Sequence, residues 1–393
     1  MILLRELWLG GGLRALVPIS VLALMSCDGL YTGVKKPEGL VCERIKAAGK
    51  GLTEALAASM PGDCVIAAEG TWTGSFVVPV DVSLAASEGE RVVLKGDGSA
   101  NPVLTVMGGS RSSVRNVEID TSGGGGIVID PGPANLFGVS IAGARKTALV
   151  ASCMRGACAG ETVIQDSQLS KSATGVIISG AKVRIEGGRI AQMAGTGLSD
   201  GSGVVAFGGA HLTMNGVTVE GNQAVGVLVD GTSTHAALRN CIVKNNLGRG
   251  VWIQQATDGG VSVTGGEVTG NALVGLGARD SAGLTFSGVT VQDTKAVRVA
   301  IDLGNFEDVG DGIGLFTGVT DVKMESVVSR RNARAQILVD EIGKAIRMGT
   351  PDVSGGLFRV VVQRTSAMVD VPPAVLDTPG RLLTVENSAQ SVP

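Results

Sequence analysis

Aromatic residues are scarce in this chain of 393 residues, at 3% of the sequence, and histidine occurs only twice. Lysine and arginine form no run longer than a pair, such as Arg330 and Arg331. With a net charge of -3, the sequence lacks the basic surface that nucleic-acid binding needs. The composition therefore excludes nucleic acid as a partner and disfavours a site built on histidine ligands.

Glycine, by contrast, accounts for 60 residues, and 44% of the sequence is hydrophobic. That apolar content excludes a disordered chain, because enough surface is available to bury. A core with few aromatic rings must be built from small, branched side chains, and the many glycines indicate frequent turns. Together these features predict many short strands.

One phrase recurs with fixed spacing. In "VEGNQAVGVLVDG", Asn222 precedes Gly226 by four residues, and the same spacing separates Asn246 from Gly250. Neighbouring repeats of the strand that follows, which opens on glycine or in one case on Thr147, lie 21 to 28 residues apart. A period in the twenties with insertions at turns is typical of a solenoid. The strand-opening glycines are Gly126, Gly175, Gly203, Gly226, Gly250 and Gly275.

Each period contains three strand phrases, such as "HLTM", "VTV" and "VLV", which predicts a triangular coil. Alternation along each strand places every second residue in the core. A leucine-rich repeat is excluded because leucine does not dominate the inward positions, and a hexapeptide helix is excluded by the uneven period. Stacking the coils predicts one inward column made of Val217, Cys241, Gly266, Val289 and Val327.

The asparagines of the recurring phrase are predicted to stack at one corner of the coil. Asparagine tolerates a left-handed backbone at turns, and its amide can bond to the backbone or to the next asparagine. Thr294 occupies one corresponding place in the series. The predicted turn ladder comprises Asn222, Asn246, Asn271 and Asn332.

The segment "GLTEALAASMPGDCVIAAEGTWTG", residues 51–74, resembles the opening of pectin-lyase-like right-handed β-helices, and more narrowly of bacterial parallel β-helix repeat proteins. The resemblance covers roughly residues 50–345. It implies an all-β, right-handed parallel β-helix, a three-sheet solenoid with a short N-terminal capping helix. Leu52 and Leu56 would give that helix an apolar face over the first coil. The alternative is a helix unrelated to capping.

The chain begins with Arg5 and Arg14, followed by an apolar run, residues 15–25, that is too short to span a bilayer comfortably. The junction "LMSC" resembles the bacterial lipobox, which implies lipidation of Cys27. An uncleaved anchor and an ordinary secretory signal are the alternatives. The expected localisation is the bacterial cell envelope, as a membrane-anchored lipoprotein. The predicted divisions are a signal peptide (1–26), a tether (27–41), a cap (42–64), the β-helix (65–345) and a C-terminal cap or tail (346–393).

Five cysteines remain after Cys27. In an oxidising envelope compartment, their spacing predicts two local disulfides. Cys241, at a position filled by valine in other repeats, is interpreted as a buried small hydrophobic residue. The predicted disulfide pairs are Cys42 with Cys64 and Cys153 with Cys158.

The densest acidic stretch, "IDLGNFEDVGDG", lies in the longest interval between matching inward residues and is predicted to be an insertion. Oxygen ligands at this density could bind Ca²⁺, and the alternative is a solvated polar loop. No other cofactor is expected. The candidate ligands are Asp302, Asn305, Glu307, Asp308 and Asp311.

Two further features were weighed as sites. His211 and His235 begin equivalent strands one coil apart, so their rings are expected to approach each other, as neutral side chains or as a metal-binding or basic pair. Asp200, Asp230 and Asp280 lie at turns, where aspartate bonds to the local backbone.

An apolar stripe on an outward face is another candidate. Alternation predicts that Leu228 points outward, in a column with Val205, Ile177 and Trp252. Such a stripe needs a cover, which is either the chain's own loops, its C-terminal residues 344–393 or a partner. Trp252 is also a candidate platform for a sugar ring.

Three functions remain open. The first is a lipid-tethered, non-catalytic β-helix that binds envelope polysaccharide or protein. The second is a polysaccharide lyase, hydrolase or epimerase, which the scarcity of aromatics and of acidic clusters on the coil disfavours. The third is a structural or adhesion module. The apolar stripe favours the first.

Overall fold

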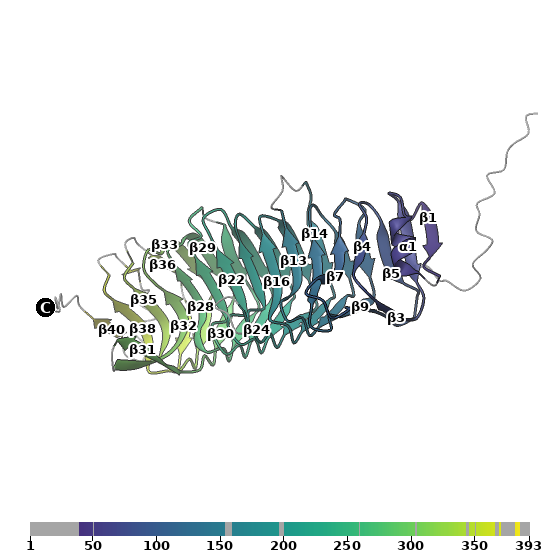
Figure 1. Cartoon of the computed structure of the whole chain (residues 1–393). Helices are drawn as coiled ribbons and strands as arrows, with labels where there is room; N and C mark the ends of the chain where they lie inside the picture. Colours follow the sequence, from purple (N-terminus) through teal and green to yellow (C-terminus); the bar gives the residue numbers. More distant parts are fainter. Residues whose placement is uncertain are drawn as a thin grey trace, which may run out of the picture. The chain divides into compact units, whose positions relative to one another are not determined.

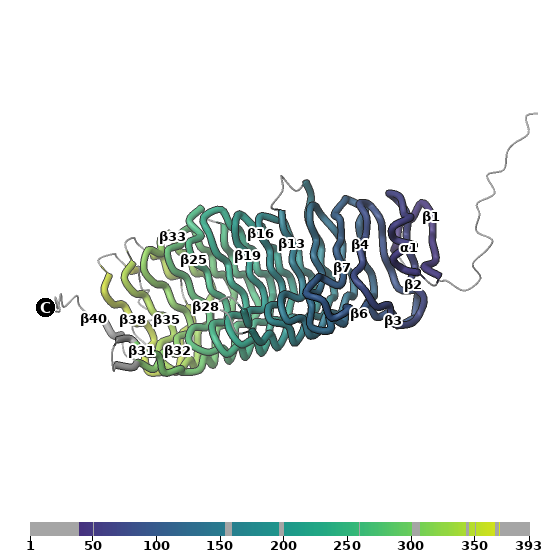
Figure 2. Tube along the Cα trace, in the orientation of Figure 1, coloured from purple at the N-terminus to yellow at the C-terminus, as the bar shows by residue number. Residues whose placement is uncertain are grey.

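The computed structural model describes residues 39–49, 51–153, 159–195, 200–258, 260–302, 305–342, 346–349, 351–365, 369–370 and 382–385. All of them belong to one compact unit, Val34–Pro393. In these ranges the chain winds into a solenoid of three parallel sheets, with one short helix at its start (Figures 1 and 2). The predicted all-β, three-sheet solenoid is confirmed. The signal peptide, Cys27 and most of the tether lie outside the described residues.

Each coil contributes one strand to each of three sheets, here called sheets A, B and C. Sheet A contains β1 (Arg44–Ala47), β2 (Asp63–Ala67), β5 (Ser83–Ala86), β8 (Ser113–Arg115), β11 (Asn135–Phe137), β14 (Thr162–Gln165), β17 (Lys182–Glu186), β20 (His211–Asn215), β23 (His235–Arg239), β26 (Val261–Thr264), β29 (Ala282–Ser287), β33 (Thr320–Glu325), β36 (Ile346–Met348) and β39 (Val369–Asp370).

Sheets B and C follow the same order along the solenoid. Sheet B contains β3 (Gly70–Thr73), β6 (Val92–Lys95), β9 (Val117–Asp120), β12 (Ser140–Ala142), β15 (Gln168–Ser170), β18 (Arg189–Ala191), β21 (Thr218–Glu220), β24 (Ile242–Lys244), β27 (Glu267–Thr269), β30 (Thr290–Gln292), β34 (Val328–Arg330) and β37 (Asp352–Ser354). Sheet C contains β4 (Phe76–Val78), β7 (Pro102–Val106), β10 (Gly125–Ile129), β13 (Thr147–Ser152), β16 (Thr174–Ser179), β19 (Val204–Phe207), β22 (Val227–Asp230), β25 (Val251–Gln254), β28 (Leu273–Arg279), β32 (Asn305–Leu315), β35 (Ala335–Asp340), β38 (Phe358–Gln363) and β40 (Leu382–Val385), with β31 (Val297–Asp302) paired to β32 outside this order.

The core is a file of small, branched side chains along the solenoid axis. Val227 aligns with Val251, and Val251 with Leu276, so that like side chains stack in successive coils. All three are at most 1% exposed. In the predicted inward column, Val217, Val289 and Cys241 are buried, and Cys241 carries a free thiol. Small, branched side chains therefore fill the core, in agreement with the low aromatic content of the sequence.

The turn between sheets B and C carries the asparagine ladder. Asn222 donates from its backbone N and from Nδ2 to Oδ1 of Asn246, at 3.0 and 2.8 Å. Asn246 bonds in the same way to Asn271, and all three side chains are buried. Because each asparagine side chain hydrogen-bonds to the asparagine of the next coil, the ladder satisfies polar groups that water cannot reach.

The ladder is interrupted at Thr294. Asn271 donates its Nδ2 to the carbonyl of Val243, and Thr294 donates its backbone N to Oδ1 of Asn332. The Oγ1 of Thr294 is buried and has no hydrogen-bond partner among the described residues. Beyond this point Asn332 bonds to Gln336 rather than to another asparagine.

The fixed distance between asparagine and glycine has a steric cause. A Cβ at Gly226 would lie 2.6 Å from the carbonyl oxygen of Gly250 and 2.8 Å from Nδ2 of Asn246. The backbone of Gly226 is not in the left-handed region, so the requirement is for space rather than for conformation. The asparagine of one coil and the glycine of the preceding coil therefore fit together as a pair.

The left-handed residue of this turn is the one before the asparagine. Gly221 has φ 63° and Asn245 has φ 54°, whereas Asn222 and Asn246 do not have positive φ. Asparagine tolerates the left-handed conformation, but these ladder asparagines do not adopt it. Their side chains are occupied across the coils, and the preceding residue turns the chain.

The N-terminal end of the coil is closed by helix α1 (Leu52–Ala57). Leu52 and Leu56 are each 1% exposed and belong to the main hydrophobic core, so the helix covers the open end as predicted. Strand β1 precedes the helix and extends sheet A by one strand beyond β2. No helix in the described ranges has the length and apolar character needed to cross a membrane.

Asp63 anchors this end of sheet A. Its Oδ1 accepts a hydrogen bond from Nε of Arg44 at 2.5 Å, and its Oδ2 lies 2.8 Å from Nζ of Lys46. Burial alone would raise the pKa of Asp63, but hydrogen bonds from Lys46, from the backbone of Met60 and from Arg44 outweigh burial and lower the pKa to about 2. The carboxylate therefore holds β1 against β2.

Asp63→Asn is expected to lower the free energy of unfolding at neutral pH by about 2 kcal/mol, because charge-assisted hydrogen bonds are lost. A carboxyl whose pKa is depressed on folding stabilises the fold above its usual pKa of 3.8, and this contribution fades as the pH falls toward about 2. Urea unfolding of both proteins at several pH values measures the difference. A difference that stays constant between pH 4 and pH 2 would contradict this role.

The coil continues past the predicted boundary at residue 345. Strands β36 and β39 extend sheet A, β37 extends sheet B, and β38 and β40 extend sheet C. The division into a β-helix (65–345) and a C-terminal cap or tail (346–393) is therefore wrong for the described residues. Val369 and Asp370, the start of "VDVPPAVL", form a strand of the coil rather than a strip across its face.

The acidic insertion is a β-hairpin. Strand β31 pairs antiparallel with the first half of β32, and the second half of β32 pairs in parallel with β28 as a regular strand of sheet C. The hairpin thus extends from the corner at which the chain passes from sheet B to sheet C. The predicted insertion is present, and it is ordered through strand pairing.

Candidate functional site

The outward face of sheet A is crossed at its N-terminal end by residues 39–43, here called the strap. The strap joins the coil to the residues that precede it. Leu40 is 3% exposed and packs with Cys64, Ile66 and Ala85, whose side chains point away from the core. As a result, β2 and β5 are buried along their whole length, whereas later strands of sheet A alternate between buried and exposed residues.

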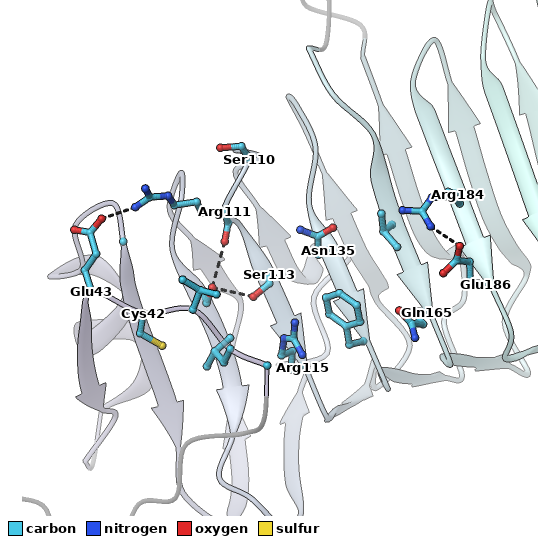
Figure 3. A pocket seen from close by; sticks show the side chains of 17 residues that line it. Cys42, Glu43, Ser110, Arg111, Ser113, Arg115, Asn135, Gln165, Arg184 and Glu186 are labelled. Atoms are coloured by element: carbon cyan, nitrogen blue, oxygen red, sulfur yellow. Dashed lines mark hydrogen bonds and ion pairs between the residues drawn. The ribbon is translucent and has the colours of Figure 1, made fainter.

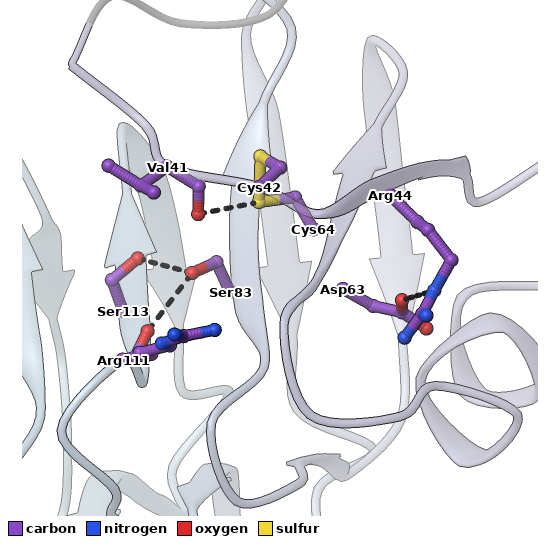
Figure 4. The surroundings of a disulfide bond; sticks show 8 residues. All are labelled: Val41, Cys42, Arg44, Asp63, Cys64, Ser83, Arg111 and Ser113. Atoms are coloured by element: carbon purple, nitrogen blue, oxygen red, sulfur yellow. Dashed lines mark hydrogen bonds and ion pairs between the residues drawn. A yellow bond between two sulfur atoms is a disulfide. The ribbon is translucent and has the colours of Figure 1, made fainter. Parts of the chain in front are cut away.

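A disulfide fixes the strap in place. Cys42 is bonded to Cys64, with Cα atoms 5.5 Å apart (Figure 4). The backbone N of Glu43 donates a hydrogen bond to the carbonyl of Gly62 at 2.9 Å. Glu43 also pairs with Arg111, which lies at the turn before β8 (Figure 3). The strap therefore stands as a wall at one end of the face.

Beside this wall lies a groove of about 580 Å³ on sheet A. Its floor is formed by outward side chains of β8, β11, β14 and β17. Ser113 aligns with Asn135, and Arg115 with Phe137, in the next coil. Figure 3 shows Arg115, Asn135 and Gln165 on neighbouring strands of this floor. Because the strands are in register, polar side chains repeat at the strand spacing along the groove.

The centre of the groove is a guanidinium stacked on a ring. The Cζ atom of Arg115 lies 4.0 Å from the centroid of Phe137. Burial lowers the pKa of Arg115, but arginine remains charged at physiological pH. Stacking fixes the plane of the guanidinium, which can present paired N–H donors to an anionic group.

The carboxylates of the groove are held by arginines. Arg184 bonds to Glu161 at 2.9 Å and also to Glu186, and these hydrogen bonds raise the pKa of Arg184. Glu43 is paired with Arg111. Each of these acids has a cationic partner, so none of them is placed as a free proton donor or acceptor.

Serine hydroxyls line the end of the groove nearest the strap. Ser113 donates to Oγ of Ser83 at 2.8 Å, and Ser83 donates to the carbonyl of Arg111 at 3.2 Å. These bonds connect the floor of the groove to the turn that carries Arg111. The hydroxyls are therefore fixed relative to the wall.

The two histidines lie farther along the same face. His211 and His235 are aligned in adjacent strands, and their rings stack with centroids 4.5 Å apart. Burial, followed by the charges of His235 and Lys182, lowers the pKa of His211. The imidazole of His211 is therefore neutral at pH 7. In the described ranges, no three His, Cys, Asp or Glu side chains come together in a group that could hold a metal ion.

The apolar stripe lies on sheet C with the register that alternation predicts. Ile177, Val205, Leu228 and Trp252 align in successive strands. Val205 and Trp252 are 6% and 7% exposed, whereas Ile177 and Leu228 are half-buried. The binding surface predicted at these four residues stays a prediction.

Trp252 is covered by its own neighbours. Arg249 stacks on the indole at 4.2 Å, and Phe316 lies 5.7 Å away between ring centroids. A Cβ at Gly277, the next residue of the column, would meet the indole at 2.5 Å. The ring therefore lies flat along the face, where it is less open to a sugar than an exposed platform would be.

Two members of the acidic cluster, Glu307 and Asp311, are engaged by one arginine. Arg334 bonds to Asp311 at 2.8 Å through Nε, and also contacts Glu307. Burial raises the pKa of Asp311, to about 7, while the hydrogen bond from the backbone of Ala335 acts in the opposite direction. Asp308 is exposed, and Asp302 and Asn305 lie at the facing ends of β31 and β32. The calcium site stays a prediction.

The second predicted disulfide falls partly outside the described residues. Cys153 follows β13 and is disulfide-bonded. Cys158 lies in the segment 154–158, outside the described residues.

The groove residues were not among the predicted sites. The residues of the groove floor are ordinary outward residues of their strands, and their spacing does not distinguish them from other outward positions. They are Arg115, Asn135, Phe137 and Gln165. The signal that pointed to this region was the predicted pair of Cys42 and Cys64, which places the strap on sheet A. The groove arises where that strap ends.

Residues 104–291 match the family model described as "Right handed beta helix region". This match and the three parallel sheets confirm the predicted right-handed parallel β-helix. No curated protein sequence matches the chain.

Several solved structures are similar at low sequence identity. The tailspike protein gp208 of Dettilon is 12% identical, with 79% of this chain and 64% of the tailspike covered and a TM-score of 0.47. The A-module of the Azotobacter vinelandii mannuronan C-5 epimerase AlgE4 is 13% identical, with 81% and 82% covered and a TM-score of 0.43. Pectate lyase Pel9A is 12% identical, with 85% and 78% covered and a TM-score of 0.32. The chain thus spans less than two thirds of the tailspike.

Proposed function

We propose that this protein is a lipid-anchored, extracytoplasmic β-helix that binds an acidic envelope polysaccharide in the groove on sheet A, without catalysing its cleavage. The observation that carries the proposal is the stack of Arg115 on Phe137 on the groove floor. A planar guanidinium held flat against a ring suits a carboxylate, and acidic polysaccharides carry a carboxylate on their sugar units.

The surrounding side chains support a chain-like ligand. Ser113, Asn135 and Gln165 lie on successive strands and supply hydroxyl and amide groups along the direction of the solenoid. A polymer of sugars could meet a donor or acceptor at each strand. A small ligand would need an enclosed pocket, whereas this groove is open along the face.

The paired state of the carboxylates supports binding without turnover. Cleavage or epimerisation of a polysaccharide requires a group placed to take or give a proton. Glu161 and Glu186 both bond to Arg184, which occupies a carboxylate oxygen of each.

Binding is tested by affinity electrophoresis in gels that contain polygalacturonate, with dextran as a neutral polymer. Arg115→Ala and Phe137→Ala are each expected to weaken binding to polygalacturonate at least about tenfold, as expected for the loss of one desolvated contact. Arg239→Ala removes an exposed positive charge from the same column outside the groove and serves as the control. Equal retention of all variants would reject the groove, and shortening of the polymer would favour an enzyme instead.

The lipid anchor is tested separately. Cys27→Ser is expected to move the protein from the membrane fraction to the soluble fraction, because the attachment point of the lipid is lost. Fractionation followed by immunoblotting measures the shift, with Cys241→Ser as a control at a buried free thiol. Continued membrane retention of the Cys27 variant would contradict the anchor.

A further inference from the structure

The strap is held on sheet A by few contacts other than its disulfide. Leu40 contributes the one strap side chain that is fully buried, and the backbone N of Glu43 contributes one hydrogen bond, to Gly62. The ion pair of Glu43 with Arg111 joins two side chains that are 55% and 60% exposed, where water screens the attraction. Val41, between them, is 86% exposed.

The chain immediately after the strap is held independently. Strand β1 begins at Arg44 and pairs with β2 along its length, from Arg44 opposite Asp63 to Ala47 opposite Ile66. The carboxylate of Asp63, in β2, also forms ion pairs with Arg44 and Lys46 of β1. Detachment of residues 39–43 therefore need not disturb β1, the capping helix or the coil.

We infer that the Cys42–Cys64 disulfide is a redox-sensitive clasp that holds the strap as a wall of the groove. A dithiol reductant would supply two electrons and two protons, giving thiols at Cys42 and Cys64 and a disulfide in the reductant. Without the covalent link, one buried leucine and one hydrogen bond must offset the conformational entropy of five ordered residues. The strap then leaves the face of sheet A.

Release of the strap changes the end of the groove at which the strap forms the wall. Gly39 to Glu43 line the groove, and Glu43 pairs with Arg111 from the wall side. When the strap leaves, Arg111 loses its partner and the outward side chains of Cys64, Ile66 and Ala85 become exposed. The effect on ligand binding rests on the proposed function, whereas the release of the strap does not.

Release is measured by hydrogen exchange with single-residue resolution on the full chain. After reduction with dithiothreitol, the amide of Glu43 is expected to exchange at least tenfold faster, while the amides that β1 and β2 share in their ladder keep their protection. Because dithiothreitol also reduces the disulfide of Cys153, the variant Cys42→Ala is measured without reductant. Protected amides in β22 and β25 report that this variant is folded. Unchanged exchange of Glu43 in both experiments would overturn the clasp.

A second variant separates the disulfide from the packing of the strap. Leu40→Ser removes the buried side chain but leaves the covalent link, so exchange of Glu43 is expected to rise less than in Cys42→Ala. An equal or larger rise in Leu40→Ser would show that packing, rather than the disulfide, holds the strap, which would overturn the proposal.

The binding arm uses polygalacturonate as the probe. Cys42→Ala is expected to bind about tenfold more weakly than the oxidised protein. Faster exchange with unchanged binding would overturn the role of the strap as a wall of the site. Absence of binding in both forms would reject the proposed function, and the exchange of Glu43 would still decide whether the clasp exists.

Discussion

Replacing Asn246 with alanine is expected to lower the free energy of unfolding by about 4 kcal/mol, since several buried polar groups lose their partners together. Oδ1 of Asn246 accepts from the backbone N and from Nδ2 of Asn222, and its Nδ2 donates to Asn271. All three residues are buried, so water cannot take the place of the lost amide. The variant also leaves a small cavity at the corner of the coil.

Urea unfolding followed by circular dichroism measures this loss. Gln223→Ala changes an exposed residue at the same corner and is expected to stay within about 0.5 kcal/mol of the wild type. Asn246→Asp keeps the size of the side chain but removes the donor to Asn271, so it distinguishes lost hydrogen bonds from the cavity. A cost below about 1 kcal/mol for Asn246→Ala would mean that the ladder contributes little to stability.

Replacing Gly226 with alanine is expected to cost about 3 kcal/mol, although the change adds a single methyl group to a turn. The added Cβ would lie 2.6 Å from both the carbonyl oxygen of Gly250 and Cγ1 of Val243. Nδ2 of Asn246 is also within 2.8 Å, so relief of the clash would displace the ladder. Backbone atoms of the next coil cannot move aside without shifting that coil.

Gly209→Ala is the matched control for this substitution. Gly209 has φ 79° and nothing within 4 Å of its ideal Cβ, so alanine there is strained by conformation but meets no clash. Its expected cost is about 1 kcal/mol. Thermal denaturation of both variants compares the two causes. Equal melting temperatures would show that the steric clash at position 226 costs no more than the conformational strain at position 209.

The sequence was sufficient to predict the coil because its determinants are local and repeated. Alternating valines and the Asn222 to Gly226 spacing recur in consecutive turns, and each repeat reinforces the same register. The reason for the glycine could not be read in this way. It depends on Asn246, which is twenty residues away in the chain and adjacent only after the coils stack.

The end of the β-helix was predicted too close to the N-terminus, because the asparagine and glycine of the corner stop recurring before the buried core residues do. Ile346, Met348 and Val353 are still buried in the last coils, although the described turns there carry no ladder asparagine. Inward residues alone form a weak pattern, since two or three apolar positions per strand occur in many sequences. The end of the recurring phrase was therefore mistaken for the end of the coil.

The groove could not be predicted from its own residues, because a tertiary contact creates it. Phe137 and Arg115 belong to different coils, and the wall comes from the strap, which precedes the first coil. Only the cysteine spacing linked those regions in the sequence. The apolar stripe was predicted as a column, and its four residues align in successive strands. Among the described residues, Arg249 and Phe316 lie against Trp252.

The interruption of the ladder at Thr294 bears on how the solenoid comes apart. A solenoid can be described as a one-dimensional row of units, each coupled to its two neighbours, and the row separates first where the coupling is weakest. At Thr294 a buried hydroxyl stands in place of the ladder amide, and the hairpin of β31 and β32 begins a few residues later. Coils before and after this point are therefore expected to melt as two cooperative blocks, with the boundary between β27 and β30 in sheet B.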